Sequence, residues 1–346
     1  MDLTDMEVDI VAACVKHSIF TQNLEGKGIR VLELSGRLRS PGNYPLFRKL
    51  LQERAYDVVH FNLFQGMSLY YVQIAKEEGV PIRIAHSHNT ALRKSKGRWL
   101  KMLLHKLGSS LYASAATEFW ACSGAAAKFL FPAGDLKKKN YRFIPNGIDV
   151  ERFKFNQTMR DEVRAKLGIT DAFVIGNIGR LCYQKNQSFL IELMPELLER
   201  RPNAKLLLVG EGEDKGALVR RTKALGVSGN VLFYGITDEP EKLYCAMDVF
   251  AFPSRFEGLG IVAIEAQANG LPVVCSQFVP QEASVTTKFH RLSLHAGTAA
   301  WVSKLLKSDN SQIPRKDEWK HVVHSGYDIS DVSAFIHHYF IGVPSI

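Results

Sequence analysis

The sequence lacks the two features that would place a chain across or beyond a membrane. None of its apolar runs reaches about eighteen residues without a charge, the length that a membrane-spanning helix needs. Its first ten residues carry four acids, whereas a secretory signal begins with basic residues and continues with a long apolar stretch. We therefore expect a cytoplasmic protein whose membrane contact is peripheral, at the inner face of the plasma membrane.

Cysteine pairs and acidic metal motifs are also missing. The five cysteines are widely scattered and form no C-x-x-C pair, so neither a disulfide framework nor a zinc site is indicated. No D-x-D element offers two carboxylates to a divalent ion. We expect no metal and no cofactor.

Positive charge is present but unevenly distributed. The net charge is +9, and residues 1–150 hold 21 Lys and Arg against 13 Asp and Glu, whereas residues 151–346 hold 23 against 22. The densest part is "RKSKGRWLKMLLHKLG" (93–108), which contains no acid and repeats apolar residues at helical spacing. It predicts a basic amphipathic helix that faces an anionic membrane surface. The residues expected there are Arg93, Lys94, Lys96, Arg98, Trp99 and Lys101.

Two other interpretations of this basic segment are open. The apolar stripe of an ordinary surface helix would face the core, with the lysines solvated. Nucleic acid would also suit a basic face, but no recognisable nucleic-acid-binding module is present, so we expect no nucleic-acid partner.

Short apolar runs of β type alternate with amphipathic helical stretches along the chain, which is typical of α/β domains with parallel sheets. The length favours two domains. Because "PNG" (145–147) interrupts the pattern, we expect one doubly wound domain over 1–145, a second over 146–325 and a terminal helix over 326–346. The ten expected strands are "VDIVAA", "IRVLEL", "DVVHFN", "PIRIAHSH", "EFWACS", "FVIGNIG", "KLLLVG", "NVLFYG", "DVFAFPS" and "PVVCS". Ligands of such sheets bind at the carboxyl ends of the strands.

The stretch "FEGLGIVAIEAQANGLPVV" (256–274) follows one of these strands and predicts an anion site. Gly258 and Gly260 permit close approach of a ligand, and free N–H groups around Leu259 and Gly260 lie at a helix N-terminus. Glu257 and Glu265 flank that site. Carboxylates would repel a phosphate, so their expected partners are the neutral hydroxyls on either side of it, as in a sugar nucleotide.

Other roles remain open for these glutamates. Glu257 could cap the helix and Glu265 could be an exposed or ion-paired helix residue. A glycosidase carboxylate pair usually comes from separate elements that flank the bond, whereas here one loop supplies both acids.

Three further loops of the second half carry weaker signals. In "NIGRLCYQKN", Arg180 and Lys185 could neutralise a diphosphate and stabilise it as it departs, although such pairs are also common on solvated surfaces. In "LLLVGEGEDKG", Glu211 stands between glycines in a weak phosphate loop or an ordinary turn. In "VLFYGIT", the backbone at Gly235 and Ile236 could contact a base.

The first half offers two histidines at the end of a strand, in "RIAHSHNT". His86 and His88 share one face of an extended chain. A metal pair is conceivable, but no third ligand follows at a recognisable spacing. A hydrogen bond to a hydroxyl of the sugar or acceptor, or a structural role, fits the pair better.

Together these stretches resemble the GT-B glycosyltransferases of the family 4 type, the glycosyl transferases group 1, especially bacterial enzymes of exopolysaccharide and capsule assembly. The resemblance covers most of the chain and implies two Rossmann-like domains that face a cleft. It rests on the ordered stretches "RIAHSHNT", "FWACSGAAAKFLF", "FIPNGIDVERF", "IGNIGRLCYQKN", "LLLVGEGEDK", "VLFYG" and "FPSRFEGLGIVAIEAQANGLPVV". In addition, "GYDISDVSAFIHHYF" resembles the family's tail helix, which crosses back onto the N-terminal domain.

The resemblance implies transfer of a hexosyl group from a nucleotide-diphosphate sugar to a hydroxyl of a saccharide acceptor, lipid-linked in such pathways. Configuration would be retained, no metal would be essential, and the leaving phosphate would take the acceptor's proton. The implied catalytic residues are Glu257 at the transferred sugar, His88 at the sugar or acceptor, and Arg180 and Lys185 at the diphosphate. The implied donor-binding residues are Gly179, Arg180, Lys185, Glu211, Gly235, Ile236, Gly258, Leu259, Gly260 and Glu265, the last at the ribose.

One departure from the family pattern concerns the N-terminal domain. The family begins with a strand and a Gly-rich loop before anything that matches "MEVDIVAA", and that unit is not found in this sequence. Its strand would lie beside "DVVHFN". An inactive donor-binding remnant is therefore an alternative function, and a sugar-nucleotide epimerase on the same fold is another.

Overall fold

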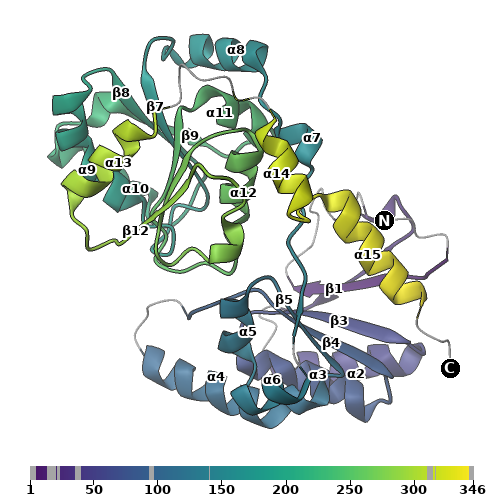
Figure 1. Ribbon diagram of the computed structural model, residues 1–346. Coiled ribbons are helices and arrows are strands. Elements are labelled where there is room, and N and C mark those ends of the chain that lie inside the picture. Colours follow the sequence, from purple (N-terminus) through teal and green to yellow (C-terminus); the bar gives the residue numbers. More distant parts are fainter. Residues whose placement is uncertain are drawn as a thin grey trace. The chain divides into compact units, whose positions relative to one another are not determined.

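The computed structural model describes residues 5–13, 21, 24–35, 40–92, 97–139, 141–309, 315 and 317–342. Its contacts divide the chain into two compact units, the first made of Met1–Ile144 with Val332–Ile346 and the second of Pro145–Asp331 (Figure 1). Each unit holds a parallel β-sheet with helices, so the predicted α/β class is confirmed. Within the described part of the chain, no helix is long and apolar enough to cross a membrane.

The first unit contains six short strands. They are β1 (Asp9–Ala13), β2 (Arg30–Leu34), β3 (Val58–Leu63), β4 (Ile82–Ser87), β5 (Glu118–Ala121) and β6 (Arg142–Phe143). Its helices are α2 (Asn43–Glu53), η1 (Gly66–Leu69), α3 (Tyr70–Glu77), α4 (Arg98–Tyr112), η2 (Ala113–Ala115), α5 (Gly124–Leu130), α6 (Ala133–Lys139) and the greater part of α15 (Ile329–Ile341).

The strands of the first unit form two separate sheets. The larger has the order β3-β4-β5-β6, and β1 pairs only with β2, in both cases with parallel strands. Among the described residues, the outer edge of β3 therefore has no strand partner. The expected place of a further βα unit beside residues 57–62 stays a prediction.

Helix α15 packs against one face of the larger sheet. Val332 joins a buried cluster with Ile84, Trp120 and Ile144, and the ring of Tyr339 lies 5.1 Å from that of Trp120. The Tyr339 hydroxyl donates to Glu118 on β5. Val332, Ile336, Tyr339 and Phe340 therefore attach this helix to the first unit.

Helix α4 buries its small and polar side and exposes its apolar side, the reverse of an ordinary surface helix. Its buried face holds His105, Gly108 and Ser109, and its leucines point outward. A Cβ at Gly108 would lie 2.6 Å from the backbone of η1, so only glycine permits this contact. His105 accepts from the Gly66 N–H at 2.8 Å and contacts the Phe129 carbonyl at 2.8 Å. The interpretation in which the apolar stripe faces the core is therefore wrong.

The outward face of α4 is apolar over its whole length, with a basic rim. Its exposed apolar residues are Trp99 (73%), Leu100 (45%), Leu103 (56%), Leu104 (38%), Leu107 (48%) and Leu111 (55%). Arg98, Lys101 and Lys106 are exposed beside them. Arg93, Lys94 and Lys96 lie outside the described residues. We call this surface, Trp99 to Leu111 with its three basic neighbours, the α4 face.

The second unit is built on a single parallel sheet with the order β12-β11-β10-β7-β8-β9. Its strands are β7 (Phe173–Ile178), β8 (Ala204–Val209), β9 (Val231–Gly235), β10 (Val249–Phe252), β11 (Val273–Ser276) and β12 (Phe289–Leu292). Its helices are α7 (Val150–Phe153), α8 (Gln157–Leu167), α9 (Gln187–Arg200), α10 (Lys215–Ala224), η3 (Ser228–Asn230), α11 (Pro240–Ala246), α12 (Ile261–Ala268), η4 (Gln281–Ala283), α13 (Thr298–Lys307) and α14 (Glu318–His324).

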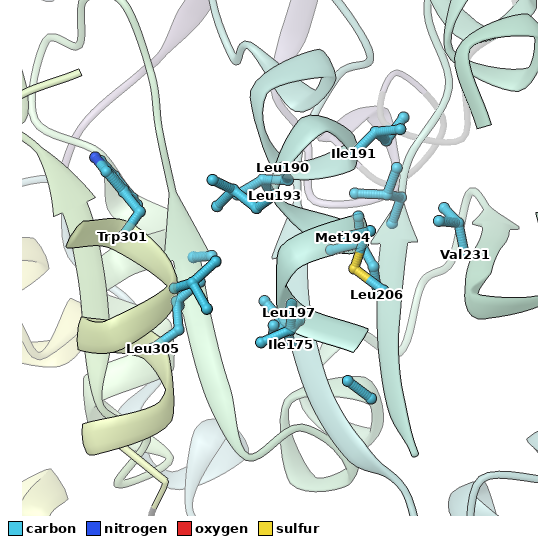
Figure 2. Close-up of a cluster of buried hydrophobic side chains, with 14 of the residues drawn as sticks. Ile175, Leu190, Ile191, Leu193, Met194, Leu197, Leu206, Val231, Trp301 and Leu305 are labelled. Atoms are coloured by element: carbon cyan, nitrogen blue, oxygen red, sulfur yellow. The ribbon is translucent and has the colours of Figure 1, made fainter. Parts of the chain in front are cut away.

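All ten expected strands are present in the two units. The short strands β6 and β12 were not expected, because "RF" and "FHRL" carry no apolar run. The core of the second unit is formed by continuous apolar strands and the inner faces of α9 and α13, and it includes Leu190, Met194 and Trp301 (Figure 2). Burial of this surface supplies the main favourable free energy of folding.

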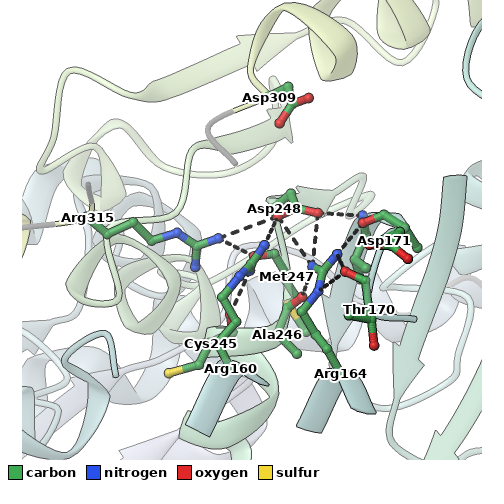
Figure 3. Close-up of polar contacts among 12 residues, drawn as sticks. Arg160, Arg164, Thr170, Asp171, Cys245, Ala246, Met247, Asp248, Asp309 and Arg315 are labelled. Atoms are coloured by element: carbon green, nitrogen blue, oxygen red, sulfur yellow. Dashed lines mark hydrogen bonds and ion pairs between the residues drawn. The ribbon is translucent and has the colours of Figure 1, made fainter. Parts of the chain in front are cut away.

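A buried ionic cluster holds one end of this sheet (Figure 3). Asp248, which is fully buried, precedes β10 and meets Arg160 at 2.5 Å, Arg164 at 3.3 Å and Arg315 at 3.9 Å. It also accepts from the Val174 backbone N–H at 2.8 Å, which ties β10 to β7. We call these four charged side chains the Asp248 cluster.

The arginines of the Asp248 cluster also bind the carbonyls at the end of α11. Arg160 donates to Cys245 and Met247, and Arg164 donates to Ala246. Guanidinium groups thus satisfy helix-terminal carbonyls that have no partner within the helix, and their charge suits the negative end of the helix dipole.

Asp248→Asn should lower the free energy of unfolding by about 3 kcal/mol, because it leaves buried guanidinium groups without their counter-charge. Urea denaturation of the full chain, followed by circular dichroism, measures the change. The control is Asp161→Asn, which removes an exposed carboxylate from α8. Equal midpoints for the two variants would contradict a structural role for the cluster.

Candidate functional site

Apart from Glu265, which lies in α12, the predicted donor-binding residues of the second unit lie at the carboxyl ends of β7, β8, β9 and β10 and in the loops that follow them. Because β10, β7, β8 and β9 are neighbours in the sheet in that order, these loops lie along one edge. This is the edge at which open α/β sheets bind ligands. These four loops all belong to the second unit.

Lys185 and Glu257 meet although they come from different loops. Lys185 Nζ lies 2.8 Å from Glu257 Oε1, and both side chains are largely buried. The ammonium group also lies 4.9 Å from the ring centroid of Phe252, at the end of β10. A fixed cation and a fixed carboxylate are therefore adjacent at the carboxyl edge, as binding of a diphosphate beside a sugar hydroxyl requires.

Several hydrogen bonds hold these two loops together. The Arg255 N–H donates to the Gln184 carbonyl at 2.8 Å, and the Gln184 amide donates to the Phe256 carbonyl at 3.0 Å. Asn186 donates to the Pro253 carbonyl at 3.1 Å and has a left-handed φ of 58°, which Asn tolerates better than most residues. The Lys185–Glu257 pair therefore sits on a rigid support.

Glu265 lies in the first turns of α12, whose N-cap is Gly260 with φ 90°. A Cβ at Gly260 would lie 2.9 Å from Phe252, so a side chain there would disturb the loop. Because Gly260 begins the helix, the capping role considered for Glu257 is wrong. The chain leaves the helix through Gly270 in a left-handed conformation, with φ 78°.

Glu265 is largely buried and accepts a hydrogen bond from the Tyr244 hydroxyl at 2.7 Å. Burial raises the pKa of Glu265 above its ordinary value, while the bond from Tyr244 and the charges of Arg152 and Lys185 lower it. Tyr244 was not found from the sequence. Its only signal is its place in the helix that precedes the strand of the glutamate loop.

Arg180 is placed differently from Lys185. Its guanidinium group is 70% exposed and pairs with Glu213 at 3.0 Å. Among the described ion pairs, none joins Arg180 to Glu257. Arg180 would therefore have to leave Glu213 to bind a diphosphate beside Lys185.

The remaining predicted residues of this edge lie in the β8 and β9 loops. Glu211 pairs with Lys215 at 2.5 Å. Gly235 has a φ of 89° and its carbonyl accepts from the Gly210 N–H at 2.7 Å, whereas Ile236 is 76% exposed, so its apolar side chain is open to a planar ligand such as a base. Leu259 is buried in the loop after β10, and a Cβ added at Gly179 would lie 3.4 Å from Lys185 Cε.

The glycines around Glu211 have a structural explanation. A Cβ at Gly210 would lie 2.3 Å from the Gly179 carbonyl oxygen, and one at Gly212 would lie 2.2 Å from that of Leu181. Gly210 also has a φ of 128°, which L side chains rarely adopt. These glycines let the β8 loop support the Arg180–Lys185 loop.

His88 belongs to the first unit and follows β4. Its Nε2 lies 2.7 Å from Asn62 Oδ1, on the neighbouring strand, and burial lowers its pKa to about 4. An amide oxygen can only accept, so this contact places the hydrogen on Nε2 and leaves Nδ1 as an acceptor at neutral pH. His88 can therefore accept a hydrogen bond from a hydroxyl.

His86 also contacts a side chain of the neighbouring strand β3. Its Nδ1 lies 3.0 Å from His60 Nε2, and burial with the neighbouring imidazoles lowers its pKa to about 2. It is 4% exposed and its Nε2 has no hydrogen-bond partner in the described structure. Asn62 and His60 were missed in the sequence, although both lie in "DVVHFN" on the face that His86 and His88 share.

Within the described residues, no group of three or more His, Cys, Asp or Glu side chains could hold a metal ion. The expectation of a metal-independent reaction stays a prediction.

Comparison with known families matches both halves of the chain. Residues 159–312 match the family model described as glycosyl transferases group 1, and residues 4–152 match the model of glycosyltransferase family 4. The first match contains all of the donor loops described above.

Individual proteins give the same result. The chain is 32% identical over 271 residues to the putative glycosyltransferase EpsF of Bacillus subtilis, covering 77% of this chain and 70% of that protein. It is 33% identical over 255 residues to a GDP-mannose-dependent phosphatidylinositol monomannoside mannosyltransferase of Corynebacterium glutamicum, covering 68% and 63%. The structure of Anabaena HepE in complex with UDP and glucose superposes with a TM-score of 0.76 at 19% identity, covering 95% of this chain and 90% of that one. This last similarity concerns the fold alone.

Gly210→Ala should lower the free energy of unfolding by about 3 kcal/mol, since the added methyl group meets a carbonyl and requires a strained φ. Gly216→Ala is the matched control. It lies inside α10, where a Cβ meets only the end of the Arg220 side chain, and should stabilise by up to about 1 kcal/mol. Denaturation midpoints compare the two, and a neutral Gly210→Ala would contradict the close contact.

Proposed function

Because the chain belongs to the GT-B glycosyltransferases of the group 1 and family 4 type, we propose that it transfers a hexosyl group from a nucleotide-diphosphate sugar to a hydroxyl of a saccharide, with retention of configuration. The observation that carries this proposal is the Lys185–Glu257 pair at the carboxyl edge of the second unit. The pair offers a cation to the diphosphate and a carboxylate to the adjoining sugar, and Glu265 stands beside it on α12.

The reaction breaks the bond between the sugar's anomeric carbon and the diphosphate, and it forms a bond from that carbon to the acceptor oxygen. The acceptor's proton passes to the leaving phosphate. Lys185, with Arg180 once it has left Glu213, stabilises the negative charge that develops on the diphosphate. Glu257 contacts the transferred sugar, Glu265 accepts from the ribose, and His88 accepts from a hydroxyl of the sugar or acceptor.

The leaving phosphate of the donor takes the acceptor's proton, and Lys185 and Arg180 stabilise its charge. We therefore propose that no metal or cofactor is essential. Backbone groups at Leu259 and Gly260 would meet the distal phosphate at the start of α12. We propose a place in the synthesis of an exopolysaccharide or capsule, because the motifs of the chain resemble those of enzymes of that kind.

The α4 face supports a lipid-linked acceptor and peripheral binding to an anionic membrane. Six exposed apolar side chains form a surface of a kind that soluble monomers seldom leave uncovered. Its rim carries Arg98, Lys101 and Lys106, and α4 contains no acid to offset them. Apolar side chains that enter the headgroup region, together with basic residues that meet anionic lipids, are typical of interfacial helices.

The divided sheet of the first unit favours one alternative. Among the described residues, the strands of the first unit form two separate sheets, whereas those of the second unit form one, so the acceptor side has less support than the donor side. The alternative is a chain that binds the donor and transfers nothing. Calorimetry with UDP and GDP, combined with assays of donor hydrolysis and transfer, separates the two, since binding without turnover favours the alternative. Chromatography of the products would reveal an epimerase.

Lys185→Ala should lower kcat on the order of 100-fold, because it removes a charge that stabilises the departing diphosphate. Glu265→Ala should raise KM for the donor about tenfold, because it removes hydrogen bonds to the ribose that exist before the reaction. Lys205→Ala and Glu196→Ala, on the surface of the same unit, are the controls. Unchanged kinetics in both site variants, with folding intact, would refute these roles.

Replacing Leu103 and Leu107 by Ser should abolish binding to vesicles that contain anionic lipid, and Arg98→Gln with Lys101→Gln should weaken it by about 2 kcal/mol. Cosedimentation measures both. Lys166→Gln with Lys223→Gln removes the same charge from the second unit and should bind as the unmodified chain does. If the serine variant still binds vesicles, the α4 face is not the membrane-binding surface. If the unmodified chain is a dimer that the serine substitutions dissociate, the α4 face is an interface with a second copy of the chain.

A further inference from the structure

Tyr244 occupies a rigid position next to the donor site. It is fully buried at the end of α11, and its ring lies 5.8 Å from that of Phe153 and 5.6 Å from that of Phe250. Its backbone carbonyl accepts from Arg315 of the Asp248 cluster at 3.4 Å. Both the main chain and the ring of Tyr244 are therefore held in place.

The hydroxyl of Tyr244 is directed at the carboxylate of Glu265. Its oxygen lies 2.7 Å from Glu265 Oε2 and 3.1 Å from the Val262 carbonyl oxygen. A phenol has a single hydrogen, and the shorter contact to the charged acceptor is the stronger one. Burial raises the pKa of Tyr244 well above its ordinary value, so the hydroxyl keeps this hydrogen at neutral pH.

Glu265 depends on this hydroxyl more than a structural glutamate would. Among the described residues it makes no ion pair, whereas Glu257 pairs with Lys185. Arg152 on α7 and Lys185 in the β7 loop act on it only at longer range. A largely buried carboxylate without a cationic partner reduces stability. Its retention beside an anion site is therefore better explained by a ligand.

We infer that Tyr244 is a positioning residue for the proposed reaction: it holds one oxygen of Glu265 so that the other oxygen accepts from the ribose hydroxyls of the nucleotide. The role rests on the proposed function. The hydrogen bond from Tyr244 has two effects: it orients the carboxylate of Glu265, and it keeps that carboxylate ionised.

The test measures the affinity for UDP and GDP by calorimetry between about pH 4.5 and 8, in the full chain and in Tyr244→Phe. We expect the dissociation constant of the variant to rise about tenfold at pH 7, the effect of one hydrogen bond to a charged group. Without that bond the pKa of Glu265 rises further. Since the ionised carboxylate is the form that accepts from the ribose, the loss of affinity toward acid should begin at a higher pH.

Two companion variants separate positioning from packing. Thr222→Val removes another buried hydroxyl, on α10, and should leave both the affinity and its pH dependence unchanged. In a Glu265→Gln background, Tyr244→Phe should have no further effect on the pH dependence. Ionisation of the nucleotide contributes equally to every curve, so only differences between curves are compared.

A shape-preserving substitution covers the case in which Tyr244→Phe does not fold. Difluorotyrosine at position 244 is a more acidic donor and should move the loss of affinity to lower pH. The inference is overturned, while the proposed function stands, if the dissociation constant depends on pH in the same way in the unmodified chain and in Tyr244→Phe or the difluorotyrosine variant. If the unmodified chain binds neither nucleotide, the proposed function itself fails.

Discussion

Asp248 is the buried charge on which the second unit is organised. Its side chain and backbone bind both Val174 at the start of β7 and the arginines that hold the end of α11. This arrangement fixes β7, α11 and β10 relative to one another at the amino ends of the strands. The opposite ends of β7 and β10 carry Lys185 and Glu257. The geometry of the candidate site thus depends on a charge cluster at the other end of the same strands.

The cluster reaches the candidate site through α11. Three guanidinium groups satisfy its terminal carbonyls, and Tyr244, in its last turn, contacts Glu265. The loops on the far side are held by backbone contacts so close that only glycine fits at Gly210 and Gly212. Rigid loops keep catalytic side chains in place before a ligand arrives, which reduces the entropy lost on binding.

Much of this could be predicted from the sequence, because the signals are local. Apolar runs bounded by turn residues predicted all ten main strands. The glutamate loop was recognised because strand, glycines and helix follow one another within a few residues. Tyr244, Asn62 and His60 were missed because their partners lie far along the chain, where spacing carries no information.

The polarity of α4 shows the limit most clearly. The sequence predicted a basic amphipathic helix within residues 93–108, since periodicity depends only on the 3.6-residue turn, and α4 covers Arg98–Tyr112. Which side of that helix is buried depends on contacts with other parts of the first unit. The close approach of Gly108 to η1 and the two hydrogen bonds of His105 place the small and polar side inward, which leaves the leucines in solvent. The same holds for the Lys185–Glu257 pair: the sequence supplied its residue types, and the neighbouring positions of β7 and β10 in the sheet brought the two side chains together.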